Sequence, residues 1–138
     1  MVLIEDGSNQ LRFEVLERLE VPQASGDLRV RLEVRSQGFS GVHTVWFQAH
    51  AFDQFLVALD DLERSRRGEA VLASLSDEEF RLTLFARDPA GHIQADGHLT
   101  QADGRRPKDL WSRLGFALEV DPTTLPQLAE DFRAEVLG

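Results

Sequence analysis

The chain has 138 residues, of which 42% are apolar and 28% are charged, a composition typical of one globular domain rather than a disordered or fibrous protein. It contains no cysteine, so disulfides, thiol catalysis and lipid attachment through cysteine are excluded. The net charge of −9 disfavours nucleic acids and anionic membranes as partners, because both are polyanions. We expect a single domain over residues 1–138 and a neutral or basic partner.

The first half of the chain predicts strands. Leu11–Val15 and Leu28–Arg35 alternate apolar and polar residues, as half-buried strands do, with a turn predicted at Ala24–Asp27 between them. A second turn at Gly38–Gly41 leads into a strand over Val42–Gln48, and this half has room for a fourth strand.

The apolar period then changes to that of a helix. One helical stripe is predicted from Phe52, Phe55, Leu56, Leu59 and Leu62. Three arginines at positions 64, 66 and 67 precede Gly68, which indicates a helix end with cations at the negative end of the dipole and a C-terminal glycine.

The second half repeats this plan. Strands are expected at Ala70–Leu75, Phe80–Arg87, Ile93–Thr100 and Trp111–Val120, with one of the intervening turns at Ser76–Glu78. Thr124 followed by Gln127 predicts a capping box for a last helix. Its buried stripe is predicted to be Leu125, Leu128, Ala129, Phe132 and Val136.

These elements predict an α+β fold in the order ββββα-ββββα. Short connections favour antiparallel neighbours, so we expect one curved antiparallel sheet of seven to eight strands with both helices packed on one face. Such a sheet is about 35 Å wide and two helices cover about 20 Å, so the remainder must curl around the helices, which we favour, or meet a second copy. The predicted core is Phe13, Val30, Leu32, Trp46, Phe55, Leu59, Leu82, Leu84, Phe116, Leu118, Leu128 and Phe132.

No catalytic or cofactor motif is present in the sequence. There is no G-x-S-x-G, and the isolated glycines do not form a phosphate-binding loop. Asp96 and His98 share one side of a strand, as two metal ligands would, but a solvated strand face is the better interpretation. The arginines of Leu28–Arg35 lack the interleaved aromatics of an RNA platform. We expect no enzyme, no cofactor and no metal site.

Several segments together resemble a known family. They are the turn Gly38–Gly41 leading into an aromatic strand, the helix from Phe52 to Leu62, the residues Gly91–Ile93, and the closing segment from Val120 to Leu128. This pattern spans nearly the whole chain and resembles the WapI-like immunity proteins of bacteria. The resemblance implies neutralisation of a cognate toxin by direct association, and it carries no catalytic residues with it.

We therefore expect a protein-binding module that acts as an immunity protein. The alternatives are a cytoplasmic domain that acts as a homo-oligomer and, with less support, a small-ligand-binding protein or an enzyme. Residues 1–6 lack the basic and long apolar segments of a secretory signal, and no apolar stretch of about 18 residues occurs, so we expect a cytoplasmic protein.

The predicted partner-binding surface lies on the strand faces opposite the core. It comprises Phe47, Phe85, Arg29, Arg31 and Arg81, because two aromatics beside arginines on a wet face have the composition of an interface hot spot. The alternative is that a loop or the N-terminal segment covers both rings.

Overall fold

The computed structural model describes residues 1–22, 26–76 and 78–138. The turns expected at Ala24–Asp27 and Ser76–Glu78 therefore lie partly outside the described residues. Among the described helices, none has both the length and the apolar character that crossing a bilayer requires.

The first four strands form one antiparallel sheet, called here the N-terminal sheet, in the order β1-β2-β3-β4. Each strand pairs with the next one in sequence, so the connections are short. The strands are β1 (Val2–Asp6), β2 (Asn9–Arg18), β3 (Leu28–Ser36) and β4 (Phe39–Phe47). The fourth strand of this half is therefore β1, which lies before the first strand that alternation identified.

The last four strands form a second antiparallel sheet, the C-terminal sheet, in the order β5-β6-β7-β8. They are β5 (Glu69–Ala73), β6 (Phe80–Ala86), β7 (Ile93–Gln101) and β8 (Ser112–Val120). A short 3-10 turn at Lys108–Leu110 precedes β8. The order ββββα-ββββα is confirmed.

Two helices complete the fold. Helix α1 (Ala49–Ser65) buries Phe52, Phe55, Leu59 and Leu62 of its predicted stripe, whereas the fifth predicted residue, Leu56, is only partly buried. Its left-handed cap is Arg66 (φ 56°), whose N–H donates to the Leu62 carbonyl oxygen at 2.8 Å, so the cap comes before Gly68. Helix α2 (Leu125–Leu137) buries all of its predicted stripe.

The start of α2 differs from the predicted capping box. The Thr124 side chain makes no cap hydrogen bond, and its hydroxyl donates instead to the Asp121 carbonyl oxygen at 2.7 Å. A 3-10 turn at Pro122–Thr124 precedes the helix, and the Asp121 carboxylate accepts from the Thr123 N–H at 3.0 Å. The Gln127 side chain donates to Asp131. The predicted capping box is therefore wrong: the side-chain cap at Asp121 belongs to the 3-10 turn, and the N-cap residue of α2, Thr124, makes no side-chain cap bond.

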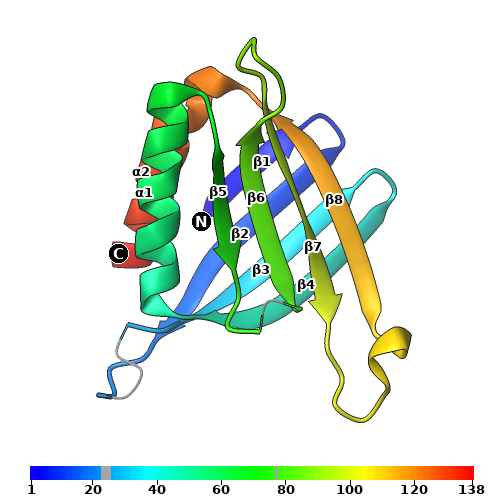
Figure 1. The fold of residues 1–138 in the computed structure, drawn as a ribbon. Coiled ribbons are helices and arrows are strands. Elements are labelled where there is room, and N and C mark those ends of the chain that lie inside the picture. The colour runs from blue at the N-terminus through cyan, green and yellow to red at the C-terminus, as the bar shows by residue number, and fades with distance from the viewer. Residues whose placement is uncertain (23–25, 77) are drawn as a thin grey trace.

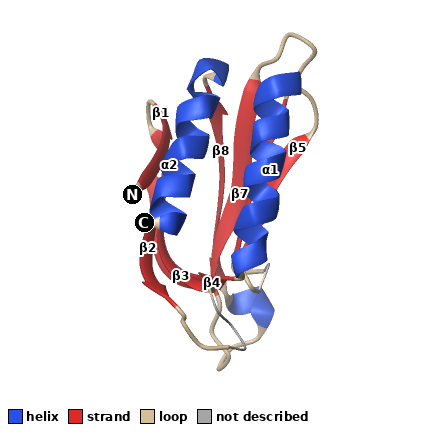
Figure 2. Ribbon diagram, turned by 90° about the vertical axis from the view of Figure 1, so that its left-hand side faces the viewer, coloured by secondary structure: helices blue, strands red, loops and turns tan. Residues whose placement is uncertain are grey.

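The expectation of one curled sheet was wrong, since the strands form two sheets. In Figure 1 the N-terminal sheet lies behind the C-terminal sheet with its strands running obliquely to it, and both helices lie on the side away from β8. Strand β8 contacts β1, β2 and β3, whereas α1 packs on β5 and α2 on β1. Figure 2 shows the two helices side by side on the side of the molecule that faces the viewer, with α2 next to β1 and α1 next to β5. Each sheet thus covers apolar surface of the other that two helices are too narrow to cover.

One core cluster joins both sheets and both helices. Eleven of the twelve predicted core residues are buried, but Trp46 is only partly buried, and Val45 and Phe47 face inward instead. The register explains this, because Phe47 pairs with Leu28 and Val45 with Val30, both of which are wholly buried. The strand Val42–Gln48 has apolar residues on both sides, so alternation alone assigned its faces wrongly.

A carboxylate from α2 compensates an irregularity in β2. The pairing of β2 with β3 shifts register between Val15 and Glu17, which indicates a β-bulge there. The Glu135 carboxylate accepts a hydrogen bond from the Val15 N–H at 2.9 Å and forms an ion pair with the Met1 ammonium group. Burial alone raises the pKa of the Glu135 carboxyl, but these two groups lower it more, so its pKa lies below its ordinary value of 4.5.

We expect Glu135→Gln to lower the free energy of unfolding by about 1 kcal/mol at neutral pH, because the hydrogen bond to a charged acceptor is weakened. A carboxyl with a lowered pKa in the folded state stabilises above its ordinary value of 4.5 and loses that contribution as the pH falls through the lowered pKa. Denaturant unfolding of both proteins from neutral to acidic pH should show the difference shrinking below 4.5. A difference that stays constant across this range would contradict the assignment.

Candidate protein-binding face

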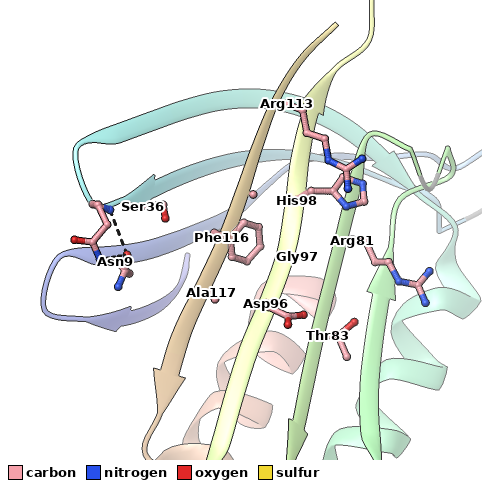
Figure 3. Close-up of a pocket in the computed structure, with 12 residues that line it drawn as sticks. Asn9, Ser36, Arg81, Thr83, Asp96, Gly97, His98, Arg113, Phe116 and Ala117 are labelled. Atoms are coloured by element: carbon pink, nitrogen blue, oxygen red, sulfur yellow. Dashed lines mark hydrogen bonds between the residues drawn. The ribbon is translucent and has the colours of Figure 1, made fainter. Parts of the chain in front are cut away.

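The outer face of the C-terminal sheet gathers polar side chains from three strands. Arg81 on β6 pairs with His98 on β7, and His98 pairs with Gly115 on β8. In a second row, two residues further along each strand, Asp96 on β7 pairs with Thr83 on β6 and with Ala117 on β8. Because directly opposed residues of neighbouring strands lie about 5 Å apart, these two rows form one continuous patch, shown in Figure 3.

This patch is concave because several of its residues are small. Gly115 has no side chain, and a Cβ placed there would meet only the Gly97 carbonyl oxygen, at 4.0 Å. Ala117 and Thr83, which also have short side chains, line the same depression. Asn9 at the start of β2 and Gln37 in the turn between β3 and β4 line it as well. The resulting shallow hollow has a volume of about 650 Å³.

A second hollow of about 610 Å³ adjoins the first and shares Arg81, His98 and Arg113 with it. Thr100, which pairs with Arg113 across β7 and β8, also lines it. The Thr100 hydroxyl is buried and has no hydrogen-bond partner within the described ranges. Two arginines therefore reach over this hollow from the two strands that flank β7.

The charges around these hollows differ in how they are paired. Lys108 is neutralised by Glu78 at 2.7 Å, and the His98 ring Nε2 lies 3.2 Å from the Glu78 carbonyl oxygen. Within the part of the chain that the structure describes, neither Arg81 nor Arg113 forms a salt bridge. Their guanidinium groups remain available to a carboxylate supplied from outside.

A third hollow of about 270 Å³ lies between the start of β4 and the start of β8. Its apolar lining residues are Phe39, Val42, Leu99 and Leu114, and its polar ones are Ser40, His43, Gln101, Ser112 and Arg113. Phe39 is 73% exposed and Val42 is 49% exposed, which is unusual for side chains of their size. Arg113 thus borders all three hollows.

The structure divides the predicted partner-binding residues among three locations. Arg81 and Phe85 lie on the face just described, and Phe85 is half-buried. Arg29 and Arg31 lie on the outer face of the N-terminal sheet, where Arg29 pairs with Glu17 at 3.0 Å and Arg31 with Glu33 at 3.5 Å. Phe47 lies in the core, so these five residues do not form one patch.

The expectation that Phe47 lies on a wet face was wrong. Its ring is 0% exposed, and it packs on Phe13, Phe52 and Phe80 with centroid distances of 5.2 to 5.9 Å. The cause is the reversed face of β4, and neither a loop nor the N-terminal segment covers the ring. Sequence reasoning also missed Phe39 and Arg113, although an aromatic residue within a turn signal such as Gly38–Gly41 is an indication that could have been used.

Asp96 and His98 were considered above as metal ligands and set aside. Asp96 and His98 both line the first hollow, but among the described residues no group of three or more His, Cys, Asp or Glu side chains is arranged as a metal site requires.

A protein-family model gives the class to which this chain belongs. The model for the immunity protein WapI-like family matches residues 2–137, so the chain belongs to that family. No curated protein matches, and no solved structure matches. Family membership indicates a toxin-neutralising immunity role and a cognate toxin as partner.

Proposed function

We propose that this chain is a protein-binding module that neutralises a cognate toxin by direct association in the cytoplasm, with the Arg113 face at the interface. The name Arg113 face denotes the surface of the three hollows around Arg81, His98, Arg113, Phe39 and Val42. One observation carries the proposal, namely that Arg81 and Arg113, which form no salt bridge among the described residues, border the same hollow and that Arg113 also borders the hollow of the exposed Phe39. Arginine and aromatic residues dominate interface hot spots.

The overall charge supports the same proposal. A chain of charge −9 attracts a basic protein over long range, which accelerates encounter. At short range, Arg81 and Arg113 then select a partner that offers a carboxylate at that position. Arg29 and Arg31 already have acidic partners, so we assign the contact to Arg81 and Arg113, with Phe85 at its edge.

The test first looks for a toxin domain encoded beside the gene for this chain, and the absence of such a gene would count against the proposal. Coexpression in a bacterial host should restore growth that this toxin domain alone prevents, and the purified pair should form a complex in calorimetric titration. The double variant Arg81→Glu with Arg113→Glu should weaken this complex about thirtyfold or more, since two hot-spot contacts are replaced by repulsion.

A matched control separates local contact from overall charge. The double variant Arg64→Glu with Arg133→Glu changes the net charge by the same amount, and these two arginines pair with Asp61 and Asp60 on the helices. It should bind the toxin domain like the unmodified chain. Growth that is not restored by the unmodified chain would overturn the proposed function, and equal loss in both double variants would remove the Arg113 face from the interface.

A further inference from the structure

We propose that the free edge of β4 over Ser40–Thr44 binds an extended segment of the partner protein as an added strand, and that Arg113 pairs with a carboxylate on that segment. This inference rests on the proposed function and names the part of the surface that makes the main-chain contacts. Addition of a strand to an exposed sheet edge gives affinity through backbone hydrogen bonds and specificity through alternate side chains.

The geometry shows which backbone groups of β4 are free. Strand β4 is the last strand of the N-terminal sheet and pairs on one side only, with β3. Near its end, the Trp46 carbonyl oxygen accepts from the Leu75 N–H at 2.7 Å, so Trp46 directs its backbone groups away from β3. Backbone direction alternates along an antiparallel strand, so Ser40, Val42 and Thr44 also direct their N–H and C=O groups outward.

These outward groups lack backbone partners. Within residues 1–22, 26–76 and 78–138, the only backbone hydrogen bond on the outer edge of β4 is that of Trp46. One edge of the strand therefore presents unpaired donors and acceptors over Ser40–Thr44.

The composition of β4 sets it apart from the other edge strands. Edges are normally protected from pairing by charged side chains, and β1 carries Glu5 and Asp6, β5 carries Glu69, and β8 carries Arg113 and Glu119. Strand β4 has nine residues and no Asp, Glu, Lys or Arg. Among the four edge strands that the structure describes, the one without such protection also exposes Phe39 and Val42.

A hollow beside this edge would receive side chains of an added strand. The hollow of about 270 Å³ is bounded on one side by residues 39–43 and on the other by Leu99, Leu114 and Arg113. Side chains of a strand paired to β4 would alternate between the face of Phe39 and the face of Val42, and Arg113, which has no ion pair among the described residues, would meet an acidic one.

Charge favours the partner protein over a second copy as the occupant. Two copies would each bring a charge of −9 to the contact, whereas a basic partner gains attraction on approach. Because β4 itself carries no Asp, Glu, Lys or Arg, discrimination between possible partners depends on the charge of the surrounding surface and on Arg113.

The experiment changes one backbone donor. Val42→Pro removes the outward N–H of residue 42 and leaves the pairing with β3 intact, and Val42→Ala removes most of the side chain but keeps the N–H. With the toxin domain encoded beside the gene as the probe, calorimetric titration should show Val42→Pro binding about tenfold or more weaker than Val42→Ala. Hydrogen exchange of the unmodified chain should show the Val42 and Thr44 amides becoming strongly protected in the complex, which tests the edge even if Val42→Pro does not fold.

Each other outcome overturns the inference in a distinct way. If the two variants bind equally and the Val42 and Thr44 amides stay unprotected in the complex, the edge of β4 is not the contact site, and the toxin-neutralising function still stands. Protection of these amides in a dimer of the chain alone, detected by sedimentation, would assign the edge to a second copy. Absence of any complex with the unmodified chain would overturn both this inference and the proposed function.

Discussion

Phe47→Ala should lower the free energy of unfolding by about 3 to 5 kcal/mol, which is the range for removing a buried aromatic ring and leaving a cavity. The Phe47 ring joins the N-terminal sheet, α1 and the C-terminal sheet through Phe13, Phe52 and Phe80. Its removal therefore weakens the contact between all three layers at once. Chemical denaturation followed by circular dichroism measures the loss.

Phe39→Ala is the matched control on the same strand. Its ring is 73% exposed, so the same truncation should change stability by no more than about 0.5 kcal/mol. If Phe47→Ala unfolded at the same denaturant concentration as the unmodified chain, the inward face of β4 would be wrongly assigned. In that case Phe47 would again be a candidate for the binding surface.

Gly97→Ala should be destabilising by about 3 kcal/mol, at the upper end of the range for an overfilled site. A Cβ at this position of β7 would collide with the Arg81 carbonyl oxygen on β6 and lie only 3.0 Å from the Phe116 ring. The obstacle is backbone, so relief requires β6 and β7 to separate, which also breaks their hydrogen bonds. The thermal unfolding midpoint should fall by many degrees.

Gly115→Ala provides the comparison on the neighbouring strand. The methyl group of an alanine at this position would lie 4.0 Å from the Gly97 carbonyl oxygen, and alanine in a strand loses less backbone entropy on folding than glycine. This variant should be as stable as the unmodified chain or slightly more stable. Similar unfolding midpoints for the two variants would show that β6 and β7 are not as close at Gly97 as the structure has them.

Local patterns in the sequence located most of the elements of this protein, although not β1. Alternation identified β3, and the 3.6-residue period identified the buried stripes of α1 and α2, because each of these signals depends only on neighbours along the chain. The family resemblance was also accessible, since turns and core positions recur at fixed places, and the match over residues 2–137 confirms it.

The candidate face depended on contacts between distant segments. Arg81 was predicted from its position on the outer side of a strand, but Arg113 joins it only because β7 pairs with both β6 and β8. Phe39 was assigned to a turn, and its exposure follows from where β4 begins relative to β8. No local period carries this information.

The α+β class, the order of elements and most of the core follow from the sequence, because burial of one face imposes a periodicity that can be counted. The division of the strands into two facing sheets, the inward side of Phe47 in place of Trp46 and the free edge of β4 follow from long-range contacts. The physical reason is that backbone pairing is set by which distant strands meet, and that choice depends on how two sheets and two helices together cover the apolar surface.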